Sequence, residues 1–339
     1  MRRTLRCLAA AVLAGGSAGC QGSENMLAPA GPAAGRIAAL GWFVLVVFIV
    51  VTVVMWALIF WAAARRRGTL LEHLPWDAPG DRRWIVIGGF TIPVIVLSTI
   101  FVVMLRSMAA FPMGDGEMSL KPADVHVTGH QWWWEIEYTE GGVDGHVVTA
   151  NELHIPTGRP VDIELRAHDV IHSFWVPRLH GKVDLVPGLV NRIRIQADRA
   201  GVYPGQCAEY CGPQHAHMML AVKAEAPDDF EAWLARLRAP AAPPASDDAR
   251  LGQRLFMNSQ CALCHTIRGT GARGLVGPDL THVGSRMGLA ANALPNNRAT
   301  LSAWVTHAQS LKPYAQMPNV TAFRGDELQQ LVAYLQGLK

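Results

Sequence analysis

Two long apolar stretches near the amino terminus limit the possible folds of this 339-residue chain most strongly. Residues 37–64 are 28 residues with no charged side chain, and residues 84–105 are a second such stretch of 22. As a helix the first would reach about 42 Å at 1.5 Å per residue, more than the ~30 Å hydrocarbon core of a bilayer. The 50% share of hydrophobic residues is also high for a soluble protein. We therefore predict two transmembrane helices within residues 36–106.

The loop between these stretches is rich in arginine close to both membrane ends. Three arginines occupy residues 65–67, and two more occupy residues 82–83. Because arginine concentrated in a short loop marks the cytoplasmic side, both termini should lie outside. Everything after Arg106 is then expected to be extracytoplasmic, on the outer face of a bacterial cytoplasmic membrane.

The first 20 residues are typical of a bacterial export signal, with a basic start, a short apolar run and small residues before Cys20. Their ending, SAGC, resembles a lipoprotein box, after which Cys20 would carry a lipid. Ser17 stands where such signals usually have leucine. An ordinary signal peptide or an uncleaved anchor is the alternative.

The exported region divides at the run APAAPPAS, residues 239–246, whose prolines favour an extended, semi-rigid linker. Residues 112–238 contain β-branched and aromatic runs separated by Gly, Pro and Asp turns, which predict an antiparallel β-sandwich or barrel. Residues 247–339 have helical patterns at both ends. We expect a β domain followed by a small all-α domain.

Soft metal ligands are concentrated in the run CAEYCGPQHAHM of the β domain, which holds Cys207, Cys211, His215 and Met218. Zinc would accept a pair of cysteines but has little use for a thioether. Thiolate, imidazole and thioether together favour copper. A second cysteine four residues after the first would let two thiolates bridge two copper ions, with His172 and His215 each capping one.

The last domain carries a c-type haem attachment motif. Cys261, Cys264 and His265 form Cys-x-x-Cys-His, in which two thioethers fix the porphyrin and the histidine takes one axial position.

The second axial ligand of such a haem should be a methionine. Met317, which is followed by Pro318, lies 52 residues after His265 and resembles the methionine loop of class I cytochromes c. Met257 and Met287 are the alternatives.

Three runs resemble signatures of cytochrome c oxidase subunit II: GHQWWWEIEY, HDVIHSFWVP and GQCAEYCGPQHAHM. The resemblance extends over roughly residues 36–238. It implies a cupredoxin-like fold around a binuclear CuA centre, with Met218 an axial ligand of one copper and the carbonyl of Glu209 a ligand of the other. It also implies that the Glu209 side chain faces a magnesium site shared with subunit I, and that Trp132 stands in place of the electron-entry tryptophan.

One feature departs from that family. Its members often carry a glutamate near the start of the second span, which opens a proton path in subunit I. Here the residues before Pro93 are WIVIGGFTI, without a carboxylate. Proton entry through this subunit is therefore not expected unless another residue such as Glu72 supplies it.

Together, the resemblance and the haem motif imply subunit II of a haem-copper cytochrome c oxidase. Electrons would be taken at haem c, passed to CuA and delivered to haem in subunit I, where oxygen is reduced to water. Implied partners are subunits I and III, with cytochrome c or a membrane-bound quinol–cytochrome c reductase as donor; no nucleic-acid partner is expected. The alternatives are the electron-input subunit of a CuA-type nitric oxide reductase and a stand-alone membrane-anchored carrier. Quinol oxidase subunit II is disfavoured because that branch lacks the copper ligands.

Charge is divided unevenly between the two exported domains. Residues 112–238 hold 11 Lys and Arg against 18 Asp and Glu, a formal charge of −7, whereas residues 247–339 hold 9 against 5, a formal charge of +4. Opposite charges could orient the haem edge towards Trp132. The alternative is that these charges only keep each domain soluble.

Overall fold

The computed structural model describes residues 24–65, 81–109, 122–139 and 147–339. The predicted signal with Cys20 lies outside the described residues, as does most of the predicted cytoplasmic loop with Glu72. The chain forms two compact units. Gly35–Phe111 is one of them, and Met1–Ala34 together with Pro112–Lys339 is the other.

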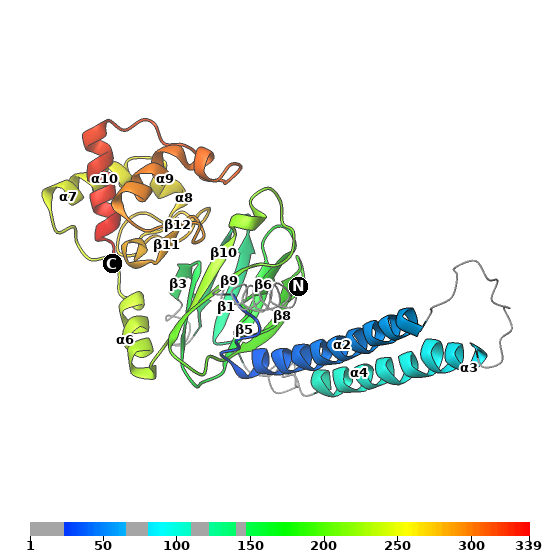
Figure 1. The fold of residues 1–339 in the computed structure, drawn as a ribbon. Coiled ribbons are helices and arrows are strands. Elements are labelled where there is room, and N and C mark those ends of the chain that lie inside the picture. Colours follow the sequence, from blue (N-terminus) through cyan, green and yellow to red (C-terminus); the bar gives the residue numbers. More distant parts are fainter. Residues whose placement is uncertain (1–23, 66–80, 110–121, 140–146) are drawn as a thin grey trace, which may run out of the picture. The chain divides into compact units, whose positions relative to one another are not determined.

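The first unit consists of long apolar helices (Figure 1). Helix α2, Pro32–Arg65, has 34 residues and a mean hydropathy of 3.1 in its most apolar window. A second helical segment, Arg82–Ala109, has 28 residues and a value of 2.5. None of the residues in either window is buried within the chain, as expected for side chains that face lipid. Both predicted spans are therefore helical and of sufficient length.

A single wide turn interrupts the second segment. Helix α3, Asp81–Val86, runs into the π-helical turn η1, Ile87–Thr91, and then into helix α4, Ile92–Ala109. Pro93 lies two residues after the end of this turn. A proline within a helix lacks an N–H donor and crowds the carbonyl four residues earlier. A π turn is one way to relieve that conflict. The Thr91 hydroxyl also donates to the Val86 carbonyl at 3.1 Å.

The β domain is a sandwich of two five-stranded sheets with mixed pairing, rather than the purely antiparallel arrangement that the sequence predicts. In the first sheet β1 is antiparallel to β2 but parallel to β5, and in the second β10 is parallel to β4. Exposure alternates along β1 and β2, as a strand with one face in a core requires. The first sheet has the order β3-β2-β1-β5-β8, formed by Val147–Ala150, Trp133–Tyr138, Val125–His130, Val161–Ala167 and Asn191–Ile195. The second has the order β4-β10-β9-β6-β7, formed by Glu152–Pro156, Met219–Glu225, Gly201–Cys207, His172–Trp175 and Val183–Leu185.

Aromatic side chains fill the space between the sheets. Trp134 of β2 is fully buried and packs edge-on against Phe174 of β6, with ring centroids 6.0 Å apart. Helix α6, Pro227–Arg238, ends the domain. Its Trp233 ring stacks on His154 of β4 at 3.8 Å between centroids. The helix therefore belongs to the β domain.

The C-terminal domain is a small helical fold. Helices α7 and α10 pack so closely that a Cβ at Gly252 would lie 2.0 Å from the Gln330 carbonyl oxygen, so this crossing requires glycine. The Phe256 and Tyr334 rings meet at the same contact, 6.0 Å between centroids. Its helices are α7, α8, α9 and α10, formed by Asp247–Met257, Cys261–Cys264, Arg298–Leu311 and Gly325–Gly337. Between α8 and α9 lie the turn η3, Val283–Ser285, and the short strands β11, Gly288–Leu289, and β12, Leu294–Pro295.

The linker of residues 239–246 is attached to the helical domain at its first residues. The His282 ring lies 3.0 Å from the Ala239 carbonyl oxygen, and the Ala241 N–H donates to the Arg268 carbonyl at 2.9 Å. The Arg268 guanidinium also donates to the carbonyls of Leu237 and Arg238 at the end of α6. These hydrogen bonds restrict the backbone at the start of the linker more than its proline-rich composition predicts.

Candidate metal centre and haem pocket

Three side chains gather at one end of the sandwich in a cluster suited to a metal ion. Ligand atoms of His172, Cys207 and Cys211 all lie within 4.8 Å of one another, and the three residues are buried. The two sulfur atoms are 3.8 Å apart and both cysteines are free. Nδ1 of His172 lies 3.9 Å from Sγ of Cys207.

The remaining predicted ligands complete this cluster. Nδ1 of His215 lies 3.6 Å from Sγ of Cys211, and Sδ of Met218 lies 3.8 Å from the same sulfur. The carbonyl oxygen of Glu209 is 3.2 Å from Sγ of Cys207. The structure thus places the two thiols between two imidazoles, with a thioether on one side and a carbonyl on the other.

Two strand ends and one loop position these groups. Cys207 ends β9 and His172 begins β6, and these strands pair antiparallel, with Phe174 opposite Cys207. We call residues 207–218 the copper loop; it includes the short 3-10 helix η2, His215–His217. Gly129 of β1 lies against the His172 ring, where an added Cβ would approach Cδ2 to 2.8 Å.

The imidazole of His172 is oriented by a carboxylate that sequence analysis did not single out. Nε2 of His172 lies 2.8 Å from Oδ1 of Asp169, so Nδ1 is left to face the sulfur of Cys207. Burial lowers the pKa of His172, but its hydrogen bonds with Cys207 and Asp169 outweigh burial and raise it. A carboxylate behind a ligating histidine is a common way to fix its tautomer and ring orientation.

The two thiols influence each other's ionisation. The hydrogen bond between them lowers the pKa of Cys207 and raises the pKa of Cys211, because the thiol of one stabilises the thiolate of the other. A bound cation would favour the thiolate form of both cysteines. Two thiolates, two imidazoles and a thioether match the preferences of copper.

The carboxylate of Glu209 is separate from this cluster. It is about half exposed and pairs with Lys182, whose Nζ lies 3.0 Å from Oε2. This ion pair raises the pKa of Lys182. Only the main chain of Glu209 therefore approaches the sulfur atoms.

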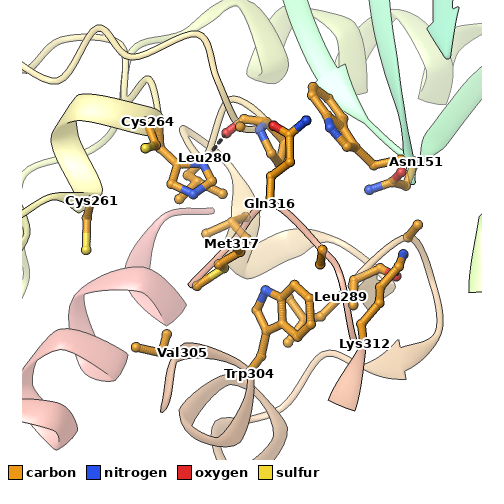
Figure 2. A pocket seen from close by; sticks show the side chains of 18 of the residues that line it. Asn151, Cys261, Cys264, Leu280, Leu289, Trp304, Val305, Lys312, Gln316 and Met317 are labelled. Atoms are coloured by element: carbon orange, nitrogen blue, oxygen red, sulfur yellow. Dashed lines mark hydrogen bonds between the residues drawn. The ribbon is translucent and has the colours of Figure 1, made fainter. Parts of the chain in front are cut away.

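The helical domain contains a pocket lined by the residues of the haem motif (Figure 2). Cys261 and Cys264 lie at one end of the view, Lys312 and Asn151 lie at the other, and Met317 lies between them. Nδ1 of His265 lies 2.8 Å from the Pro278 carbonyl oxygen, which leaves Nε2 free. Burial lowers the pKa of His265, so its ring is neutral at pH 7.

These residues fit a covalently attached haem. Two free thiols, a neutral imidazole with an open nitrogen and a thioether line one largely apolar pocket. Gly277 lies directly against the His265 ring, where an added Cβ would come within 2.5 Å of Cε1. Of the three candidate methionines, all within the described chain, Met317 lines this pocket, whereas Met257 and Met287 do not.

The same pocket is lined on its other side by the β domain. Trp132, Trp133 and Asn151 face it from there. The Trp132 indole is 7% exposed and its Nε1 donates to the Cys211 carbonyl at 2.9 Å. A Cβ at Gly212, which has a φ of 114°, would touch this indole at 3.0 Å. Trp132 therefore lies between the pocket and the copper loop.

Comparison with known proteins agrees with both domains. The family model described as cytochrome c oxidase subunit II, periplasmic domain, matches residues 123–225, and the cytochrome c model matches residues 249–339. Cytochrome c oxidase subunit 2 of Alkalihalophilus pseudofirmus is 36% identical over 326 residues, which cover 95% of this chain and 93% of that protein. The Bacillus subtilis subunit 2 is 29% identical over 331 residues, 93% of this chain and 92% of that protein. The crystal structure of the periplasmic domain of subunit II from Bradyrhizobium japonicum is 27% identical and covers 35% of this chain and 96% of its own, with a TM-score of 0.33.

A cluster of soft ligands beside a pocket suited to covalent haem defines a carrier of single electrons. The similarity along nearly the whole of both chains then shows the family. The chain belongs to the cytochrome c oxidase subunit II family, in the form with a C-terminal cytochrome c domain. It is the subunit II of a haem-copper cytochrome c oxidase, and its ligand sets imply copper and haem c.

Proposed function

We propose that electrons enter this chain one at a time at the haem domain, pass by way of Trp132 to the copper cluster, and leave for the haem of subunit I. Oxygen would be reduced to water there. The observation that carries this proposal is the position of Trp132, which lines the haem pocket and donates to the carbonyl of Cys211. One indole thus contacts both cofactor sites of the chain.

The copper cluster would hold two metal ions. The thiolates of Cys207 and Cys211 would bridge them, and His172 and His215 would cap one each. Met218 and the carbonyl of Glu209 would be the weaker ligands on opposite sides. A copper pair in this site supplies a one-electron carrier. The role of the chain is to hold all six atoms in place before and after the electron moves.

The haem would be attached through Cys261 and Cys264, with His265 and Met317 as axial ligands. Such a haem supplies a second one-electron carrier, and methionine ligation raises its potential. Pro278 keeps Nδ1 of His265 occupied, so that Nε2 is the nitrogen available to iron. The mainly apolar lining of the pocket would limit the access of water to a bound haem.

Further partners are proposed from the family. Subunits I and III would contact this chain in the membrane, and cytochrome c or a quinol–cytochrome c reductase would reduce it. The carboxylate of Glu209 would bind magnesium at the contact with subunit I, where it would have to exchange Lys182 for the metal ion. The two helices would anchor the chain in the bacterial cytoplasmic membrane, with both cofactor domains outside.

Family membership favours the oxidase over the two alternatives that the sequence left open, a nitric oxide reductase subunit and a stand-alone carrier. The order of electron transfer is tested by mixing the purified complex with reduced cytochrome c and following haem c and copper absorbance together. We expect haem c to be reduced first and copper second. The double variant Cys261→Ala/Cys264→Ala, which cannot attach haem, should show slow copper reduction. Equally fast copper reduction in this variant would refute entry at the haem domain.

A further inference from the structure

A lysine of the haem domain is buried against the copper loop. Lys312 is 4% exposed, and lysine is rarely buried without partners. Its Nζ donates to three carbonyl oxygens: Trp132 at 2.8 Å, His217 at 2.8 Å and Ala290 at 2.9 Å. The first two belong to the β domain and the third to the haem domain. One ammonium group therefore joins the two domains.

The chemistry of this contact favours a charged lysine. An ammonium group has three N–H donors, and three carbonyls accept them, so the hydrogen bonding is complete. Burial lowers the pKa of Lys312 to about 7, and the nearby Cys211 opposes this shift. Hydrogen bonds from the ammonium group to carbonyl oxygens also favour the protonated form in general. Lys312 caps the C-terminal end of α9, where a cation interacts favourably with the helix dipole. Its side chain reaches the carbonyls of the other domain.

Both β-domain carbonyls that accept from Lys312 belong to segments next to the copper cluster. Trp132 is the residue whose indole donates to Cys211, and His217 lies inside the copper loop. On the haem side, Lys312 stands five residues before Met317 in the chain. The Gln309 amide, on the last turn of α9, donates to the Met317 carbonyl at 2.7 Å. The lysine thus connects the segment that carries the haem methionine with the segment that carries the tryptophan.

A second set of contacts runs between the same domains. Oε1 of Glu152 accepts from the backbone N–H groups of Met287 and Gly288. The Asn292 amide donates to the Asn151 carbonyl at 2.9 Å. The Met219 N–H donates to the Ala291 carbonyl at 3.3 Å. The loop of residues 287–292 is therefore also held by the β domain.

We infer that Lys312 is a positioning residue that holds the haem domain on the copper loop, with Trp132 between the two cofactor sites. This inference rests on the proposed transfer of electrons from haem c to copper. Lys312 itself carries no electron; it fixes the separation over which the electron moves. Without it the haem domain would spend more time away from Trp132, still attached through the linker.

The test uses the complete oxidase complex with Lys312→Met, which keeps the length of the side chain but removes the charge and all three donors. Lys339→Met is the matched control, because it removes the same charge from an exposed residue of the same domain. Haem c is reduced by a light pulse, and the rate of its reoxidation by copper is measured. We expect this rate to fall by about 10-fold or more in Lys312→Met, because the loss of even one hydrogen bond to a charged group shifts an equilibrium by about that factor and three are lost here. The control should equal the wild type.

Hydrogen–deuterium exchange gives a readout that does not depend on electron transfer. The amides of Met287, Gly288 and Met219 bond across the domains and should exchange faster in Lys312→Met. The amide of Cys207, which donates to Met218 within the β domain, should not change. The copper spectrum and the haem potential should remain those of the wild type.

The outcomes separate the two proposals. If the wild type itself passes no electron from haem c to copper, the proposed function fails. If the wild type does so and Lys312→Met matches it in rate and in exchange, the positioning role is wrong. A slower rate with unchanged exchange and an altered copper spectrum would also refute it, because the lysine would then act on the copper ligands rather than on docking.

Discussion

The indole of Trp132 and the carbonyl of Cys211 are joined by a hydrogen bond of 2.9 Å. The Gln131 amide donates to the same oxygen at 2.7 Å. Cys211 contributes its thiol to the metal cluster, and its backbone carbonyl accepts hydrogen bonds from two consecutive residues, Gln131 and Trp132. Both of these residues also line the haem pocket. This short connection is the basis of the first prediction.

Replacing Trp132 by phenylalanine should slow electron transfer from haem c to copper. Phenylalanine keeps an aromatic ring but has no N–H for the Cys211 carbonyl, so the hydrogen-bonded contact is lost. We expect a decrease on the order of 10-fold, the factor that corresponds to one lost hydrogen bond to a buried group. Flash reduction of haem c in the complex measures the rate. The variant Trp133→Phe is the control, and an equal decrease there would contradict a special role for Trp132.

Replacing Cys207 or Cys211 by serine should convert the copper pair to a single ion or abolish it. Each sulfur would bridge both ions, and a neutral hydroxyl does not replace a thiolate as a ligand for copper. Covalent haem should be retained at wild-type levels because its pocket does not use either residue. Copper content and electron paramagnetic resonance measure the result. An intact mixed-valence spectrum in either variant would show that the centre is not a thiolate-bridged pair.

Replacing Met317 by alanine should leave the haem covalently attached but lower its reduction potential. The thioether is expected to be an axial ligand, and methionine ligation raises the potential of haem iron. A redox titration of the haem band measures the shift. Met287→Ala is the matched comparison, because Met287 lies outside the pocket. If the potential falls in Met287→Ala and not in Met317→Ala, the ligand is Met287.

Salt should slow the reaction between separated domains more than the reaction within the intact chain. The formal charges of −7 and +4 attract the domains at low ionic strength, and the Debye length falls from about 10 Å at 0.1 M to about 3 Å at 1 M. In the intact chain the contacts are mainly buried hydrogen bonds, which salt screens less. The complex cut by a protease site inserted into residues 239–246 is compared with the uncut complex over a range of salt. A salt-independent rate after cleavage would remove charge as a cause of docking.

The ligands of both cofactors could be predicted from the sequence because they lie in short motifs. Cys207, Cys211, His215 and Met218 fall within one loop, so their proximity follows from local spacing. His172 is distant in the chain, and only the expectation that a thiolate-bridged copper pair needs a second capping imidazole connected it with them. The structure brings His172 beside Cys207 through the pairing of β6 with β9.

The contact between the domains could not be predicted in this way. Two of the carbonyls that accept hydrogen bonds from Lys312 lie 180 and 95 residues earlier in the chain. Because every residue has a backbone carbonyl, a sequence pattern cannot show which of them accept. Counting charges predicts an attraction but not where it acts. Asp169, by contrast, lies three residues before His172, and a carboxylate at that spacing was a signal that sequence analysis could have used.

Because the haem domain covers Trp132, a freely diffusing donor cannot compete for that indole while the domain is in place. If electrons enter at haem c as proposed, the donor would be recognised by the exposed surface of the haem domain, which includes Leu263 and Leu275 at 75% and 85% exposure. The copper loop then has no part in recognising the donor. A lineage could therefore exchange one donor for another through substitutions around the haem, while the residues that hold copper stay the same.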